Sequence, residues 1–511
     1  MKFFLKNIFL VGFLAGFFVG MEAQGPLVQT LRDDPAAPSG RAAAQNSPVL
    51  REGFSNKALA RESGVISGLD QSVFDERAKP QEKVVKKWTF LVYMAADNDL
   101  FPFASQNLAQ LKEIGSNENL TILVHLDIKV PGKSKVTKRL LVKKNQIMQI
   151  GPDMCLDSGS EETLVSAGLW AIHDFPSEHL VIDFWNHGSG DLNPRLRKTI
   201  NPAFLFRYDP ETGMVRLDRS IAFMDFVDLL SKDEQGEPIC ACDPDRGICF
   251  DETYHSYLDD GKLMRGLKRI CRARGGKNID IILFDACLMA GTGTACIMSH
   301  FADYMVASEE VVLGPGYNYK LVAGLLARSD IDPETMVKKI VSDYEVVYGK
   351  VTGDYTHSAF RLSEFNALND NIDTLAQLLM TALTQQEEQS VRNAIKSSRS
   401  RYACTYFDEP SYIDLGHFYL NLRDRVSQMR LNTNSDEMKQ RILQVLNDGL
   451  ICMSHLIIAN VCGANLAGAH GLSIYFPEYR INNPHHESYQ YTEFAQHNRW
   501  VDFLKAYHKL V

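Results

Sequence analysis

Apolar runs of strand length alternate with helix-patterned segments from Trp88 to about residue 365, and this alternation constrains the fold most strongly. The strands are expected in WTFLVYMAA (88–96), LTILVHLDI (120–128), HLVIDFWNHGSG (179–190), IDIILFDACLMA (279–290), DYMVASEEVV (303–312) and HSAFRLSEF (357–365). Helical spacing occupies most of the sequence between them, apart from a short ribbon around 138–144 and an irregular stretch at 189–260. Strands separated by helices favour a mainly parallel sheet covered by helices on both faces. The sequence therefore predicts an α/β fold.

The chain has 511 residues, which is enough for two or three domains. Residues 1–23 carry two early lysines and then an apolar run, which is typical of a signal peptide cleaved near Ala23. Because that run is shorter than the ~20 residues of a spanning helix, no membrane span is expected in the mature chain. Residues 24–86 are rich in Pro, Ala, Ser and charge and read as a flexible pro-segment or linker. We predict a sheet domain at 87–364, with a long loop at 189–260, and a mainly helical region at 365–511 packed on it.

Net charge, cysteine content and glycine spacing argue against nucleic-acid binding, a disulfide scaffold, a zinc site and dinucleotide binding. The net charge of -9 gives no reason to expect nucleic acid as a partner. Ten cysteines are too sparse for a disulfide scaffold in a chain of this length. Cys240, Cys242 and Cys249 lie close together near His255, but the C-x-C spacing is not that of a zinc site, so a local disulfide or free thiols are expected. GTGTA at 291–295 lacks the third glycine and the acidic partner of a dinucleotide-binding motif.

Two predicted strands end in reactive side chains, His187 in WNHGSG and Cys287 in FDACLMA. In parallel sheets the functional crevice lies beyond the carboxyl ends of the strands, so the two can meet there. An imidazole beside a thiol activates it as a nucleophile, and the backbone N–H groups of Gly188 and Cys287 could hold the oxyanion of an acyl-transfer intermediate. Taken singly, His187 could also be an ordinary loop histidine and Cys287 an ordinary core cysteine.

The motifs WTFLVYMAADNDL, WNHGSG, FDACLMA, VASEE…GPGYNY and GLSIYFP together resemble the clostripain family of cysteine peptidases, relatives of the caspases, gingipains and legumain. The resemblance runs from about Trp88 to the C-terminus and omits parts of the long loop. It implies a six-stranded caspase-like sheet, His187 as general acid/base and Cys287 as nucleophile. It also implies cleavage after Arg or Lys, with Asp285 lining the specificity pocket, where a carboxylate can pair bidentately with a basic side chain. Asp285 could instead cap the strand end through backbone bonds. Glu309 and Glu310 could share the pocket but are expected to be surface charges.

The resemblance further implies a zymogen that cuts itself between His187 and Cys287 into a light and a heavy chain. The candidate bonds follow Arg195, Arg197, Lys198, Arg207, Arg216, Lys232 and Arg246. Arg246 lies in DPDRG, a turn-forming sequence. The loop is longer than the family pattern, which complicates the choice. No cofactor is assigned, and calcium stays possible, because some family members need calcium and others do not. Asp97 and Asp99 are candidate ligands, although a full site needs six or more oxygens.

These features predict an exported, self-processing cysteine endopeptidase that is secreted, periplasmic or at the cell surface. Its expected partners are protein or peptide substrates with basic P1 residues, without nucleic acid. One alternative is a related peptidase that cuts after other residues, such as Asn or Asp. Another is an inactive binding or adhesin module on the same fold.

Overall fold

The computed structural model describes residues 84–190, 206–209, 214–217, 247–384, 388–429, 436–478 and 489–510. All of them belong to one compact unit, Ala42–Val511. The signal peptide and nearly all of the pro-segment predicted from the sequence lie outside the described residues. Within these ranges, no helix is both long and apolar enough to span a bilayer.

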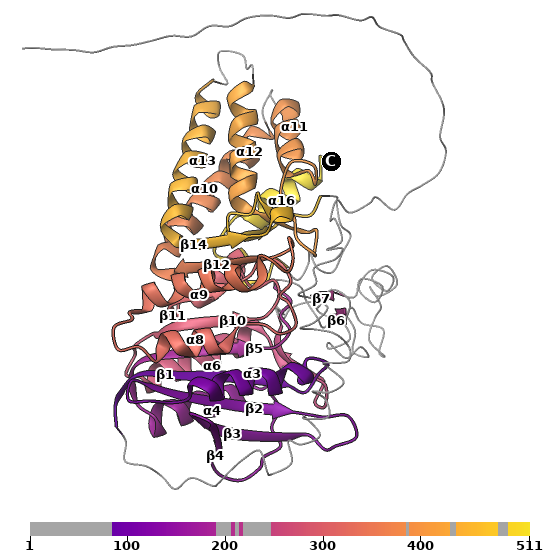
Figure 1. Ribbon diagram of the computed structural model, residues 1–511. Helices are drawn as coiled ribbons and strands as arrows, with labels where there is room; N and C mark the ends of the chain where they lie inside the picture. The colour runs from indigo at the N-terminus through magenta and orange to yellow at the C-terminus, as the bar shows by residue number, and fades with distance from the viewer. Residues whose placement is uncertain are drawn as a thin grey trace, which may run out of the picture. The chain divides into compact units, whose positions relative to one another are not determined.

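A central sheet organises the molecule (Figure 1), and nine strands form it within the described ranges. In sheet order they are β14 (Ile457–Cys462), β12 (Thr356–Arg361), β11 (Ala302–Ala307), β10 (Ile279–Asp285), β5 (Ser177–Trp185), β1 (Lys86–Ala96), β2 (Leu120–Ile128), β3 (Val136–Lys143) and β4 (Gln146–Gln149). The five strands from β11 to β2 run parallel. The flanking strands are antiparallel. Strands β1, β2, β5 and β10 are almost wholly buried, which explains their continuous apolar runs.

The predicted fold class is confirmed, but the sheet has nine strands rather than six. Each of the six expected runs contains a strand. The additional strands are β3 with its hairpin partner β4 at one edge and β14 at the other. The edge strand β4 has only four residues, and β14 follows a long helix with no helix-breaking residue between them.

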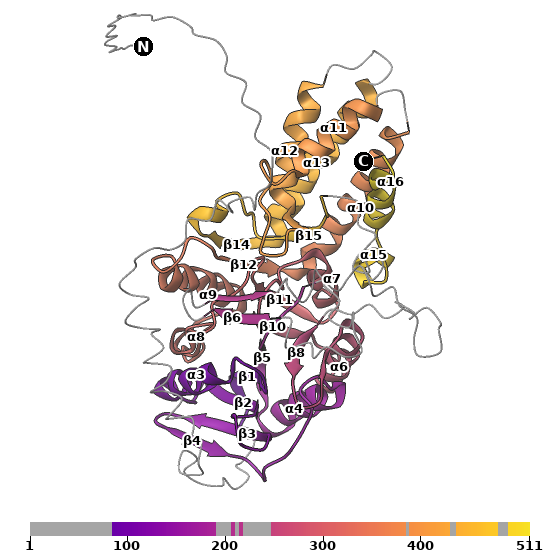
Figure 2. The same ribbon diagram turned by 90° about the vertical axis from the view of Figure 1, so that its right-hand side faces the viewer.

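Helices cover both faces of the sheet. Figure 2 shows α3 (Phe101–Ile114), α8 (Tyr319–Leu326) and α9 (Pro333–Tyr348) on one side, and α4 (Glu161–Asp174) and α6 (Asp260–Ala273) on the other. The sequence fixes several helix starts. The carboxylates of Asp259 and Asp332 accept hydrogen bonds from the first turns of α6 and α9, and Pro333 opens α9.

The region after residue 364 is mainly helical, as predicted. Its main helices are α10 (Phe365–Ala382), α11 (Glu388–Arg399), α12 (Leu415–Gln428), α13 (Asp436–Leu456) and α16 (Trp500–His508). Helix α10 packs on α13 and α16, and α12 packs on α11 and α13. Because α13 leads directly into β14, this region also supplies an edge strand of the sheet. The domain boundary at residue 364 stays a prediction.

The remaining elements are short. They are the paired strands β6 (Phe206–Asp209) and β7 (Met214–Leu217), β8 (Ile248–Asp251) and β9 (Ser256–Leu258), β13 (Tyr412–Asp414) and β15 (Ser473–Tyr475), the helices α7 (Thr292–Met298) and α15 (Glu493–Gln496), and two single 3₁₀ turns at Leu362–Glu364 and Ala464–Leu466.

Candidate active site

The ends of β5 and β10 bring the predicted dyad to one place. These strands are parallel neighbours in which Trp185 pairs with Asp285, and His187 and Cys287 each lie two residues beyond that pair. The loops that follow the strands are in contact, since a Cβ on Gly188 would lie 2.5 Å from the Cys287 carbonyl oxygen. Only glycine fits this approach, so the Gly after His187 allows the two loops to touch.

His187 is fully buried and held from two directions. Its Nε2 lies 2.6 Å from Asp99 Oδ1. The preceding Asn186 accepts a hydrogen bond from Phe250 N at 2.8 Å and donates to Ala95 O. Strands β1 and β8 therefore hold the loop that carries His187. The sequence alone carries no signal for Asn186 in this position, and it points to Asp99 only as a possible calcium ligand.

Cys287 is buried, with 3% of its surface exposed. Its Sγ accepts a hydrogen bond from Val312 N at 3.3 Å. Burial raises the pKa of the thiol to about 12; the hydrogen bond from Val312 lowers the pKa, and the carboxylates of Asp408, Glu310 and Asp285 raise it. In this conformation the sulfur is therefore a protonated thiol at neutral pH.

The Asp285 carboxylate is buried and forms hydrogen bonds with other groups of the chain. It accepts hydrogen bonds from Tyr317 N at 3.0 Å and Tyr319 Oη at 2.9 Å, and Gly316 lies against it. The same Tyr319 hydroxyl lies 2.6 Å from Asp183. A hydroxyl donates one hydrogen, so one of the two carboxyls must be protonated for both contacts to be hydrogen bonds. Burial accordingly raises the pKa of Asp285 to about 6 and raises that of Asp183 as well.

The expectation that Glu309 and Glu310 are surface charges is wrong. Both are buried, at 1% and 0% exposure. Glu309 accepts a hydrogen bond from Gly471 N at 3.1 Å, and Glu310 accepts one from Asp408 N at 3.0 Å. The C-terminal region covers these side chains, and this contact between distant parts of the chain has no local sequence signal.

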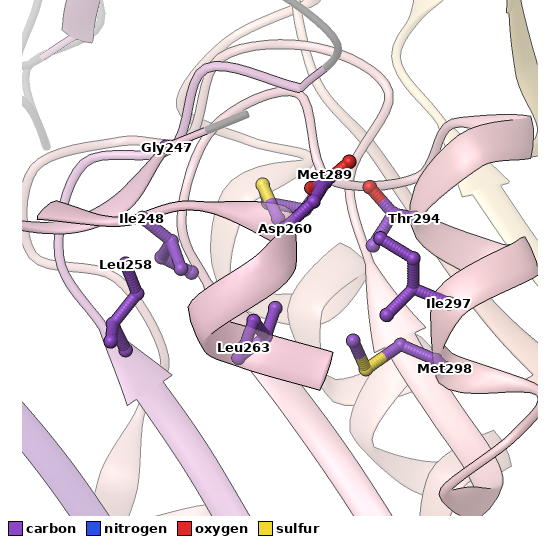
Figure 3. A pocket seen from close by; sticks show the side chains of 9 residues that line it. All are labelled: Gly247, Ile248, Leu258, Asp260, Leu263, Met289, Thr294, Ile297 and Met298. Carbon is purple, nitrogen blue, oxygen red and sulfur yellow. The ribbon is translucent and has the colours of Figure 1, made fainter. Parts of the chain in front are cut away.

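A small cavity lies beside the loop that follows Cys287 (Figure 3). Its lining consists of Gly247, Ile248, Leu258, Asp260, Leu263, Met289, Thr294, Ile297 and Met298. Met289 belongs to the loop after Cys287, and Gly247 immediately precedes β8 within the long loop. The lining includes neither His187 nor Cys287.

The two candidate calcium ligands, Asp97 and Asp99, do not share a site. Asp97 pairs with Lys135 at 3.2 Å, whereas Asp99 contacts His187, so the two carboxylates serve different partners. Over the described ranges, no group of three or more His, Cys, Asp or Glu side chains is arranged to hold a metal ion. Cys249 is a buried free thiol, and Cys240 and Cys242 lie outside the described residues.

The candidate cleavage bonds divide into two groups. Arg195, Arg197, Lys198, Lys232 and Arg246 lie outside the described residues. Arg207 and Arg216 are paired in the β6–β7 ribbon. A peptidase binds its substrate as an unpaired extended segment, so β6 and β7 would have to separate before the bond after Arg207 or Arg216 could be cut.

The comparisons with known proteins agree with this architecture. The model of the Clostripain family matches residues 92–201 and 234–507, and the unmatched residues 202–233 fall within the long loop. No curated protein matches the chain.

Among solved structures, a secreted C11 cysteine protease from Bacteroides thetaiotaomicron, in complex with an irreversible peptide inhibitor, is similar with a TM-score of 0.53 and 18% identity. That match covers 81% of this chain and 99% of the other. An inactive zymogen C11 protease from Parabacteroides distasonis gives a TM-score of 0.52 at 18% identity, covering 82% of this chain and 99% of the other. At these identities the structures establish the fold, while the family match spans most of the sequence. The chain belongs to the clostripain family of cysteine peptidases.

Proposed function

We propose that this chain is an exported, self-processing cysteine endopeptidase that cleaves after Arg or Lys, with Cys287 as nucleophile and His187 as general acid/base. One observation carries the proposal: the loops after β5 and β10 meet where Gly188 packs against the Cys287 carbonyl. Cysteine nucleophiles act with a base beside the thiol, and loops on adjacent strand ends that touch can bring the two side chains together.

The chemistry follows from these positions. The Cys287 thiol passes its proton to His187 as sulfur attacks the scissile carbonyl carbon. His187 then returns the proton to the leaving amine as the C–N bond breaks, which leaves an acyl-enzyme for water to hydrolyse. Backbone N–H groups of Gly188 and Cys287 are the proposed oxyanion donors.

The buried thiol fits an uncut precursor. A pKa near 12 leaves little thiolate at neutral pH, so this conformation would react slowly. Cleavage after Arg246 or an earlier basic residue of the loop would place a free chain end at or before Gly247, which donates to Ser189 Oγ at 3.0 Å, two residues after His187. Loss of the hydrogen bond between Gly247 and Ser189 would then loosen the loop beside His187.

Self-processing is tested by intact mass and N-terminal sequencing of the purified chain after incubation. The wild type should yield two chains cut after Lys or Arg within the loop, and Cys287→Ala should remain one chain. Cys296→Ala is the matched control, because it removes another buried thiol only nine positions away and should still mature. A Cys287→Ala chain that matures alone would show that its thiol does not make the cut.

Asp285 is the proposed specificity residue, since a buried carboxylate offers a strong partner to a guanidinium or ammonium group. Its present bonds to Tyr317 and Tyr319 mean that a P1 side chain can reach it only after residues 313–319 shift. The test is a panel of fluorogenic peptides with Arg, Lys, Asn or Asp at P1. Asp285→Asn should lose cleavage after Arg and Lys by at least tenfold while keeping its melting temperature. An unchanged preference in the folded variant would place the pocket acid elsewhere.

A further inference from the structure

We infer that Asp99 is the positioning residue of His187, so that the site works as a Cys–His–Asp unit; this rests on the proposed function. The starting observation is the 2.6 Å contact between Asp99 Oδ1 and His187 Nε2. An ionised carboxylate can only accept, so the hydrogen lies on Nε2. In a neutral imidazole this leaves the lone pair on Nδ1, which becomes the nitrogen that exchanges protons with the thiol and the leaving amine.

The burial of the two partners suits this role. The His187 side chain is fully buried, whereas that of Asp99 is 37% exposed. The ring is thus enclosed by protein, while the carboxylate keeps part of its hydration and does not carry the full desolvation cost of a buried charge. Such a group can accept the Nε2 hydrogen bond both when the ring is neutral and when it becomes an imidazolium.

The backbone around Asp99 is fixed on both sides. The side chain of Asn98 donates to Ala95 O and to Phe250 O, each at 3.0 Å, and accepts from Leu100 N at 3.1 Å. Two residues before Asp99, the side chain of Asp97 accepts a hydrogen bond from Thr253 N at 3.2 Å. The carboxylate therefore projects from a turn that is bonded at several points.

The histidine loop is bonded to the same anchor points. Asn186 donates to Ala95 O and accepts from Phe250 N at 2.8 Å, and Asn98 bonds to the same two residues. Two asparagines thus tie the Asp99 turn and the His187 loop to the backbone of the same two residues, Ala95 and Phe250. The geometry points to a rigidly held acid–imidazole pair, which is what orientation of a catalytic base requires.

In the reaction the thiol proton moves from Cys287 Sγ to His187 Nδ1 as the S–C bond forms, and it then moves from Nδ1 to the amine nitrogen as the C–N bond breaks. Asp99 neither gains nor loses a proton. It keeps the Nε2 hydrogen in place, and with it the ring orientation, while the imidazolium exists.

Kinetics provide the first test. Wild type, Asp99→Ala, Asp99→Asn and the control Glu252→Gln are each matured by limited trypsin treatment and assayed on the best basic peptide. Glu252 shares the electrostatic surroundings of Asp99 and His187, so its neutralisation measures the effect of charge alone. We expect Asp99→Ala to lower kcat about 10²–10³-fold with KM changed by less than about threefold, and Glu252→Gln to change kcat by less than about threefold. Equal losses in the Asp99 and Glu252 variants, or a kcat for Asp99→Ala equal to that of wild type, would overturn the inference.

The histidine tautomer provides a second test that needs no activity. The chain is labelled with ¹⁵N-histidine in the uncut Cys287→Ala background, and the His187 ring signals are assigned by their loss in His187→Gln. The hydrogen should reside on Nε2 when Asp99 is present and redistribute toward Nδ1 in Asp99→Ala. An unchanged tautomer refutes the positioning role. An inactive wild type with the expected tautomer change would instead refute the proposed function, while the effect of Asp99 on the His187 tautomer would still hold.

Discussion

His125 is a buried ring whose titration links folding to pH. It stacks on Tyr93 with centroids 5.0 Å apart, and neither ring nitrogen has a hydrogen-bond partner among the described residues. Burial lowers the pKa of His125 from 6.5 to about 3, helped by the nearby charges of Arg139 and Lys135. Between these two pH values the unfolded chain binds a proton that the folded chain does not, so this residue makes the fold less stable as pH falls below about 6.5.

His125→Phe should therefore protect the fold against acid. The substitution keeps an aromatic ring on Tyr93 and removes the titrating group. Between pH 7 and pH 5 the variant should lose about 2 kcal/mol less unfolding free energy than the wild type. Urea unfolding of the Cys287→Ala chain, with and without the substitution, measures this at both pH values. Identical losses in the two proteins would mean that His125 is protonated in the folded state.

At the scale of elements, buried charges tie β8 to the sheet. Lys135, just before β3, lies 2.7 Å from Asp127 of β2 and 3.2 Å from Asp97 after β1, and it also bonds to Asp251 of β8. Burial alone would lower the pKa of Lys135, but the carboxylates of Asp127 and Asp251 outweigh it and raise the pKa. The ammonium therefore stays charged and holds β8, which lies within the stretch predicted as the long loop.

Removal of this ammonium should be costly. Lys135→Met leaves three carboxylates facing one another in the interior, and the expected loss is about 3–5 kcal/mol of unfolding free energy. Lys138→Met is the matched control: its amine is also buried, but it pairs with Asp153, which is 51% exposed and can be rehydrated. Denaturant unfolding of both variants should separate them by more than about 2 kcal/mol. Similar small losses would show that the acidic cluster protonates at little cost.

The same elements show what the sequence can and cannot predict. Buried parallel strands can be predicted from their apolar runs. The ends of two such strands also predict that the loops carrying His187 and Cys287 lie side by side. Strand β14 could not be predicted, because IIANVC continues an apolar helix and becomes a strand only through its pairing with β12. The Asp99–His187 bond depends on the shape of a turn, although the strand-end rule that selected His187 applies equally to the residues after β1. Burial of Glu309 depends on Gly471, more than 150 positions away.

At the scale of the whole molecule, the long loop connects the two central strands on either side of the proposed cut. Strands β5 and β10 are neighbours in the sheet and pair at five positions, from Val181 with Ile281 to Trp185 with Asp285. A cut in the loop leaves this pairing intact. It also leaves intact the bonds from Asn186 to Phe250 and from Lys135 to Asp251. Over the described ranges no disulfide joins the two sides, so any cohesion between them there is non-covalent.

The processed light and heavy chains should consequently remain one particle. Native mass spectrometry and gel filtration of the matured enzyme should give one species containing both chains, with the elution volume of the uncut Cys287→Ala protein, while denaturing gels give two bands. Unfolding of the processed form should become concentration-dependent, because two chains must reassociate to refold, whereas unfolding of the uncut chain should not. Lys135→Met should shift dissociation to lower denaturant than Lys138→Met does, since Lys135 bonds across the cut to Asp251. Chains that separate on dilution without denaturant would mean that the loop itself, rather than the β5–β10 pairing, holds the two halves together.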